Sequence, residues 1–280
     1  MSPNFCEKTF HTYIETLSYE MVGSFYLSES LLITSLSGSI YLRIEAGEWQ
    51  HLTSQNICFI PKGMTIEIKK IESESPTQLN IIPLSSELLS GFYQQYHAIC
   101  NPKKKPKEAH SLCAANFEKV PIIQDIFNSA YLEVTELNHN NVATHDIVKK
   151  NKISIYLNFI LAFFLNVDTF VPALNASLQV SVKERVYHLI FNSTGKHNSS
   201  LESIAKQLHM SAATLKRRLV SEGTSFSKIS LMSRMNKAMM LSKTNNMPMT
   251  RIAQEVGYDD IPFFMSTFKN YYRTQSPAFL

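Results

Sequence analysis

Short apolar segments with turn signals between them fill most of the first hundred residues. Residues 64–71 alternate, with Met64, Ile66 and Ile68 on one side and polar residues on the other. Further strands are expected at 31–36, 39–44, 56–60 and 78–84, because Gly- and Pro-containing turns separate them. Several short strands at this spacing predict an antiparallel β-barrel or sandwich.

The pattern then changes to a helical period, at 85–99, 121–137 and 148–167. The helix at 148–167 is apolar on too many sides to stand alone, so it is buried in its own domain or against a second subunit. Periodicity fades near Pro172. We therefore predict an α+β chain with residues 1–170 as one domain, 171–180 as a linker and 181–280 as an all-α domain.

The last hundred residues contain two helix-turn-helix patterns joined by one long helix. A support helix at 181–191 precedes them, and Ser200 and Ser211 stand where N-caps belong. His209-Met210 form the first tight turn and Gly257 the second, with Asp259 or Asp260 as the cap of the last helix. The joining helix, 226–243, carries a stripe of methionines that is expected in the core.

The helix after Ser211 has the two faces that a recognition helix needs. Leu215 and Leu219 point inward, whereas Lys216 and Arg217 offer long hydrogen-bond donors to the major groove. In the second unit Ile261 and Pro262 can contact a thymine methyl group but cannot chelate a base. The predicted DNA-contacting residues are Ala213, Thr214, Lys216, Arg217, Arg218, Ile261, Pro262, Phe263, Ser266, Lys269 and Asn270.

Charge is distributed unevenly along the chain. Residues 181–280 carry 14 Lys and Arg against 6 Asp and Glu, a net charge of +8, whereas residues 1–180 carry 13 against 17, a net charge of −4. A polyanion such as DNA is attracted to the C-terminal part by this excess. A solvated basic face is the alternative explanation for Lys216, Arg217 and Arg218.

The C-terminal residues resemble the AraC/XylS family of bacterial transcription regulators. The resemblance covers about 182–277, lacks the Trp that the family usually has near Ser200, and rests on these residues: Ile204, Ala205, Met210, Ser211, Leu215, Arg217, Leu219, Gly223, Arg234, Ala238, Leu241, Ile252, Ala253, Gly257, Tyr258, Phe264, Phe268, Lys269 and Pro277. The strand-rich N-terminal part is similar to the cupin-like regulatory and dimerisation domain of the virulence-regulator branch, of the ToxT, Rns and GadX kind.

This resemblance implies a cytoplasmic, nucleoid-associated activator of virulence or stress genes in a Gram-negative bacterium. Its partners are then double-stranded promoter DNA, RNA polymerase and a second copy bound weakly through 148–167. Some members of the branch bind a fatty acid between the domains. Candidates for its carboxylate here are Arg43, Lys69, Lys70, Arg234 and Lys237.

Other functional classes have little support in the residues. Cys6, Cys58, Cys100 and Cys113 form no CxxC pair, and residues 23–84 contain a single histidine, His51, so neither a disulfide scaffold nor a metal site is expected. Catalytic and nucleotide-binding motifs are missing, so we expect no enzyme and no required cofactor. The polar N-terminus and the interrupted apolar run 153–167 predict neither a signal peptide nor a membrane span. Two alternatives remain: a regulator controlled by a protein partner instead of a ligand, and a non-specific architectural DNA-binding protein. The residues also do not decide whether the protein activates or represses transcription.

Overall fold

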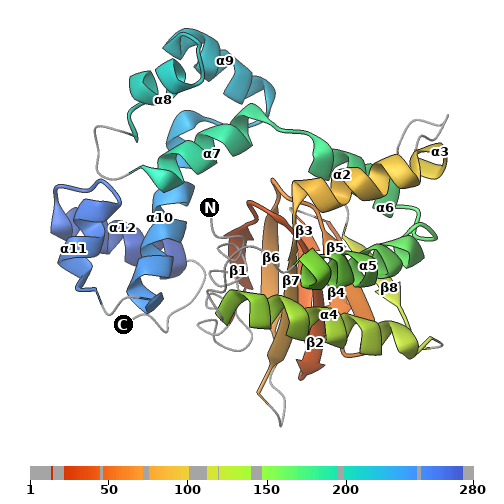
Figure 1. Cartoon of the computed structure of the whole chain (residues 1–280). Helices are drawn as coiled ribbons and strands as arrows, with labels where there is room; N and C mark the ends of the chain where they lie inside the picture. Colours follow the sequence, from red (N-terminus) through yellow and green to blue (C-terminus); the bar gives the residue numbers. More distant parts are fainter. Residues whose placement is uncertain are drawn as a thin grey trace.

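Two antiparallel four-stranded sheets form the core of the N-terminal half (Figure 1). The first sheet contains, in spatial order, β1 (Val22–Tyr26), β6 (Thr65–Lys70), β3 (Ile40–Ile44) and β4 (Gln50–Leu52). The second contains β7 (Gln78–Leu84), β2 (Ser30–Ser37), β5 (Asn56–Ile60) and β8 (Cys113–Asn116). The sheets are separate, so the expected barrel or sandwich is a sandwich, and the predicted α+β fold class is confirmed.

The computed structural model describes residues 14, 22–44, 47–71, 76–100, 112–118, 120–139, 147–193, 199–244 and 247–273. Cys6 and Pro277 lie outside these residues. The other three cysteines are buried free thiols. No helix in the described part of the chain is both long and apolar enough to cross a membrane.

Strand β2 is buried on both of its faces. Leu31 and Ile33 point into the sandwich interior, whereas Leu32 packs with the helices on the other side of the sheet. This double burial explains why the segment is a continuous apolar run, while β3 alternates between buried and partly exposed residues.

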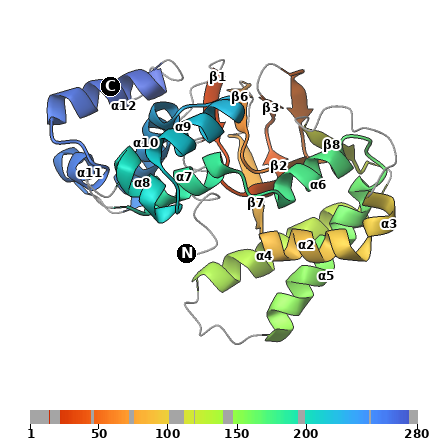
Figure 2. The same cartoon turned by 90° about the horizontal axis from the view of Figure 1, so that it is seen from above.

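Helices cover the outer face of the β7-β2-β5-β8 sheet (Figures 1 and 2). They are α2 (Ser86–Gln95), α3 (His97–Cys100), α4 (Ile122–His139), α5 (Ile147–Phe164) and α6 (Phe170–Leu178). The ring of Phe59 in β5 lies edge-on to those of Phe164 and Phe170, at centroid distances of 6.4 and 5.1 Å. These aromatic contacts attach α5 and α6 to the sheet.

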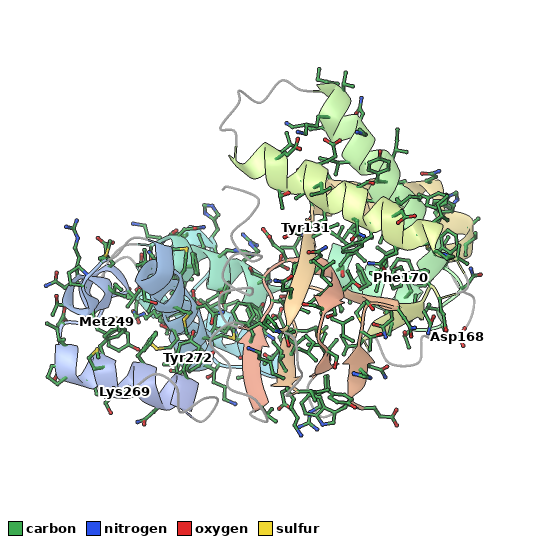
Figure 3. The ribbon with its side chains drawn as sticks, turned by 90° about the horizontal axis from the view of Figure 1, so that it is seen from below. Tyr131, Asp168, Phe170, Met249, Lys269 and Tyr272 are labelled. Carbon is green, nitrogen blue, oxygen red and sulfur yellow. The ribbon has the colours of Figure 1, made fainter. Side chains whose placement is uncertain are left out.

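Residues 171–180, which we expected to form a linker, are helical over most of their length. Pro172 lies in the first turn of α6, where its missing N–H leaves no helical hydrogen bond unmade. Phe170, Ala173 and Leu174 are fully buried in the N-terminal half, and Figure 3 shows Phe170 beside the strands. The domain limits themselves stay a prediction.

The C-terminal half is all-helical, as predicted. Its helices are α7 (Val182–Asn192), α8 (Leu201–Gln207), α9 (Ala212–Ser221), α10 (Phe226–Thr244), α11 (Met249–Glu255) and α12 (Ile261–Arg273). Along α10, Ile229 packs with the α7–α9 cluster, whereas Met235 and Met239 pack with α11 and α12. The methionine stripe is therefore core, and α10 carries both helical units.

A buried ion pair joins the two halves. The Lys62 Nζ, in the turn between β5 and β6, lies 2.8 Å from Oε1 of Glu184 in α7, and their side chains are only 7% and 11% exposed. Beside it, Lys183 donates from Nζ to the Gly63 carbonyl oxygen at 2.9 Å. The same ammonium lies 4.9 Å from the ring centroid of Tyr26 in β1. Four polar or charged groups thus hold α7 against the sandwich.

Apolar contacts reinforce this junction. The Tyr26 and Tyr187 rings lie 4.7 Å apart, and Tyr26 belongs to the buried cluster of the first helix-turn-helix unit. The sandwich interior and the core of the second unit also form one continuous buried cluster. Each helical unit is therefore packed against the N-terminal half.

We expect Lys62→Ala to lower the free energy of unfolding by about 3 kcal/mol, because it leaves the Glu184 carboxylate buried without its cation. Replacing both partners by apolar residues, as in Lys62→Met with Glu184→Leu, is expected to recover most of this loss. Urea denaturation of the full chain measures both changes. Lys152→Ala is the matched control, since it breaks an exposed lysine–glutamate pair. An equal effect of Lys62→Ala and Lys152→Ala would contradict the expectation.

Candidate DNA-binding surface

The first helix-turn-helix unit consists of α8 and α9. The Ser200 hydroxyl accepts a hydrogen bond from the Ser203 N–H at 3.2 Å, and the Ser211 hydroxyl accepts one from the Thr214 N–H at 3.1 Å. Between the helices His209 has φ = 54°, a left-handed conformation. These contacts confirm the predicted turn and both predicted caps, so the N-terminus of α9 is held in a defined place.

The second unit, α11 and α12, repeats this construction. Gly257 has φ = 85°, and the Tyr258 N–H donates to the Ala253 carbonyl at 2.8 Å, as Met210 does to Ala205 at 3.0 Å in the first unit. Asp260, one of the two predicted caps, accepts from the Phe263 N–H at 2.9 Å. Pro262 lies in the first turn of α12, where it needs no backbone donor.

When the two caps are aligned, the buried positions of the two recognition helices coincide. Leu215 and Leu219 lie four and eight residues after the cap of α9, and Phe264 and Phe268 lie at the same offsets in α12. The exposed positions differ in chemistry. Lys216, Arg217 and Arg218 of α9 correspond to Met265, Ser266 and Thr267 of α12. Three cations in the first unit are thus replaced by uncharged residues in the second.

The predicted contact residues of α9 lie on its outer surface. Ala213, Lys216, Arg217 and Arg218 are exposed, and Thr214 is half-buried, with its exposed hydroxyl 2.9 Å from the Ser211 hydroxyl. A shallow hollow is lined by Thr214, Arg217, Arg218 and Ser221. Flexible donors around an open hollow can approach the edge of a base pair.

Most of the predicted contact residues of α12 also lie on its outer surface. Pro262, Phe263, Ser266 and Asn270 are exposed, while Ile261 and Lys269 are half-buried. Ile261 also packs against the core of the second unit. Figure 3 labels Lys269 and Tyr272 on this helix.

Arg234 of α10 binds both units together. Its guanidinium donates to the Ser199 hydroxyl at 2.9 Å, before α8, and to the Gly257 carbonyl at 3.3 Å, in the second turn. It also lies 5.6 Å from the Tyr258 ring centroid. Arg234, a candidate for binding the effector carboxylate, therefore has hydrogen bonds of its own that link the two helix-turn-helix units.

A buried hydrogen-bond chain was not anticipated from the sequence. Asn236 of α10 donates to the Tyr187 hydroxyl at 3.0 Å, and the Tyr272 hydroxyl of α12 donates to Asn236 at 3.5 Å. The Ser233 hydroxyl donates to the Tyr187 carbonyl at 3.0 Å. The signal for this chain is the presence of Ser233 and Asn236 at inward positions of an apolar helix face.

Glu222, after α9, is a second positioning residue that sequence reasoning missed. Its carboxylate accepts from the N–H groups of Val182 at 2.9 Å and Lys183 at 2.7 Å, at the start of α7. A carboxylate at a helix N-terminus satisfies unpaired donors and interacts favourably with the helix dipole. The end of the recognition helix is thereby tied to the helix that contacts the sandwich.

The other effector candidates also have structural environments of their own. Arg43 pairs with Glu67 on the outer face of the sandwich and lies 4.4 Å from the Trp49 ring centroid. Lys69 and Lys70 are half-buried at the end of β6. Lys237 donates to the Ser193 carbonyl at 2.6 Å. Among the described residues, no three His, Cys, Asp or Glu side chains gather in a group that could hold a metal ion.

Comparisons with known proteins agree with this geometry. Residues 204–278 match a family model described as a helix-turn-helix domain. The chain is 26% identical over 267 residues to the transcriptional regulator SirC of Salmonella typhimurium strain SL1344, covering 92% of this chain and 88% of SirC. It is 26% identical over 248 residues to the HTH-type transcriptional regulator GadX of Escherichia coli K12, covering 88% and 84%.

The fold is similar to that of ToxT from Vibrio cholerae. One ToxT structure has a TM-score of 0.62 at 16% identity and covers 94% of both chains. Another, with an unsaturated fatty acid bound, has a TM-score of 0.58 at 15% identity and covers 91% of this chain and 88% of ToxT. Two helix-turn-helix units on one connecting helix, the matching family model and the similarity to SirC and GadX over most of the chain together confirm the predicted resemblance to the AraC/XylS family of transcription regulators, in its virulence-regulator branch.

Proposed function

We propose that the protein binds promoter DNA sequence-specifically and activates virulence or stress genes together with RNA polymerase. The observation that carries this proposal is the exposed face of α9, where Lys216 and Arg217 follow a well-capped helix N-terminus. Its place of action would be the nucleoid in the cytoplasm of a Gram-negative bacterium. A non-specific architectural role is less well supported, because DNA compaction gives no reason for a packed sandwich of this size.

In this proposal α9 and α12 enter two successive major grooves, about 34 Å apart along the DNA. Ala213, Lys216 and Arg217 contact bases in the first groove. Arg217 can chelate the O6 and N7 atoms of a guanine. Lys269 and Asn270 contact the backbone in the second groove. Base-pair discrimination is then greater in the half-site bound by α9.

Regulation is assigned to the N-terminal half, with 1–170 as its approximate limits. The Lys62–Glu184 pair and the shared apolar cluster connect this half to both helical units. A ligand or a protein partner that alters the junction would therefore alter the placement of α9 and α12. A long-chain fatty acid is the preferred ligand, because the similar fold of ToxT has been solved with one bound.

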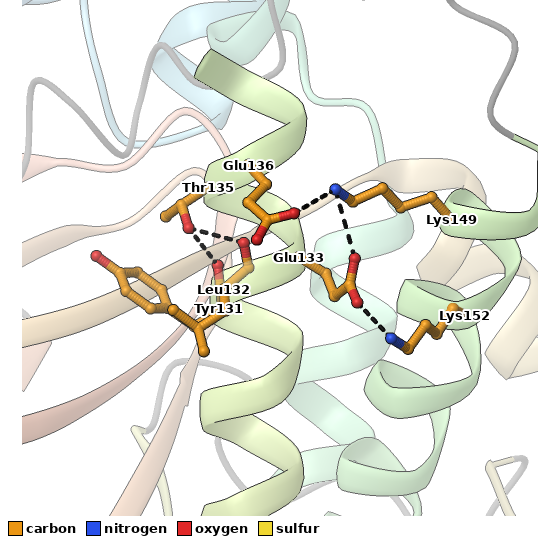
Figure 4. Close-up of polar contacts among 7 residues, drawn as sticks. All are labelled: Tyr131, Leu132, Glu133, Thr135, Glu136, Lys149 and Lys152. Carbon is orange, nitrogen blue, oxygen red and sulfur yellow. Dashed lines mark hydrogen bonds and ion pairs between the residues drawn. The ribbon is translucent and has the colours of Figure 1, made fainter. Parts of the chain in front are cut away.

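The protein is also proposed to dimerise weakly through 148–167. The inner side of α5 is buried, but Val148, Ile155 and Phe159 on its outer side are 77%, 67% and 43% exposed. They recur at i, i+7 and i+11, which places them on one face of the helix. Lys149 and Lys152 bind Glu133 and Glu136 of α4, as Figure 4 shows, and hold the helix pair together. The apolar stripe of α5 is left for a second copy.

Arg217→Ala is expected to weaken binding to a preferred duplex by about 10- to 100-fold, because a bidentate base contact contributes about 1–3 kcal/mol. The duplex is first obtained by selection from random sequences with the full chain. Lys216→Ala is also expected to abolish activation in transcription assays, with circular dichroism confirming that both variants fold.

Arg217→Lys is the matched control, since it keeps the charge but loses the planar pair of donors. It should retain the salt dependence of binding and lose discrimination at one base pair. If the unaltered protein binds all DNA sequences with equal affinity and loses this binding as the salt concentration rises, the architectural role is supported instead.

Oleate is expected to lower affinity for the same duplex about fivefold or more, because ligand coupling between sites is typically 1–3 kcal/mol. Methyl oleate, which lacks the carboxylate, is the matched ligand and should have a smaller effect. Fluorescence anisotropy below the micelle concentration measures both. Unchanged DNA affinity in oleate would contradict control by a fatty acid.

The double variant Ile155→Asp with Phe159→Ser is expected to raise the dimer dissociation constant about tenfold or more, because it removes two apolar side chains from the proposed α5 interface. Sedimentation velocity over a range of concentrations measures the change. Leu36→Asp, at an exposed position in β2, is the control and should leave association unaltered. A monomer at every concentration in the unaltered protein would refute the dimer.

A further inference from the structure

The first turn of α12 presents a large aromatic side chain to solvent. Phe263 is 63% exposed, and the neighbouring Pro262 is also exposed. Ser266 and Asn270 follow three and seven residues later, on the same helix face as Phe263. The aligned position in α9 is occupied by Thr214, which borders the open hollow beside Arg217.

Phe263 is not required for the core of its own unit. Phe264, Phe268 and Tyr272 fill that core, with exposures of 0%, 4% and 1%. The backbone N–H of Phe263 is nevertheless fixed by the Asp260 cap at 2.9 Å, and its ring lies 6.2 Å from that of Tyr258. Together with the exposed Pro262, this ring forms a small apolar patch in a fixed position at the start of α12.

The chemistry of this surface limits what it can recognise in a major groove. A phenyl ring and a proline ring make no hydrogen bonds to base edges, and Met265, Ser266 and Thr267 stand where α9 carries three cations. The apolar group on the major-groove edge of a base pair is the C5 methyl of thymine. Apolar contact with that methyl group is therefore the readout that the tip of α12 can supply.

We propose that α12 recognises thymine methyl groups, with Phe263 as the specificity-determining residue and Pro262 beside it. This inference rests on the proposed sequence-specific DNA binding and assigns the second unit a readout different from that of the first. The α9 half-site is recognised chiefly through hydrogen bonds from Lys216 and Arg217 to base edges. The α12 half-site is recognised through the position of methyl groups, so it requires thymine at one or two positions.

Substitution of uracil for thymine tests this directly, since deoxyuridine keeps every hydrogen-bonding group and lacks the methyl group. The full chain first selects its preferred duplex from random sequences, and thymines in each half-site are then replaced one at a time. Loss of one buried methyl contact should weaken binding about fourfold. We expect this loss at one or two thymines in the half-site remote from the Arg217-dependent base pair.

Phe263→Ala should bind the thymine duplex as weakly as the unaltered protein binds the uracil duplex, and should no longer distinguish the two. Val220→Ala removes an exposed apolar side chain from α9 and should preserve the distinction. The inference is overturned if uracil has no effect on the unaltered protein, or if Phe263→Ala retains the same uracil penalty.

Two further outcomes separate this inference from its premise. If selection yields no preferred duplex, specific DNA binding fails and the thymine readout fails with it. If Phe263→Ala keeps full DNA affinity but lowers transcription by RNA polymerase, the exposed ring is a protein-docking site and the thymine readout is refuted. In the second case circular dichroism of Phe263→Ala excludes loss of fold as the cause.

Discussion

Tyr187 of α7 connects the sandwich, the long helix α10 and the second helix-turn-helix unit. Its ring packs on Tyr26 of the sandwich, its carbonyl accepts from Ser233 of α10, and its hydroxyl joins Asn236. Buried polar groups are costly unless their hydrogen bonds are made, so they tolerate few alternative arrangements. The relative placement of α7, α10 and α12 therefore depends on this group of contacts. Through Asn236 the same group of contacts extends to Tyr272 of the second unit.

The two recognition helices share a frame but differ in surface chemistry. Caps, left-handed turn residues and paired buried positions recur in both units, because each recognition helix is anchored to the core of its unit through the same positions. The exposed residues are under no such constraint. A cationic surface on α9 and an apolar first turn on α12 can therefore coexist on one scaffold. Two different modes of base recognition would make the halves of a binding site unequal.

Local patterns predicted most elements of the structure, although β1, β4, β8 and α6 were missed, and three of these have a physical explanation. Strand β4 has only three residues, and β8 has two alanines, which have low strand propensity. Both form through pairing with a neighbouring strand, β3 or β5. Helix α6 was missed because Pro172 suggested a break, although proline is tolerated in a first turn. The capped turns of the DNA-binding units were predicted because their signals are local.

The sequence by itself determined the capped starts of the two recognition helices, which of their residues face inward and where positive charge accumulates. Those properties depend on neighbours within one or two turns of the chain. The tertiary structure alone decided that Lys62 pairs with Glu184, 122 residues away, and that Arg234 links the two helix-turn-helix units. It also decided that Ile155 and Phe159 of α5 are exposed, although the second half of this helix is apolar on most sides. Such contacts bring distant segments together, and a periodic pattern contains no information about which distant segment a side chain will meet.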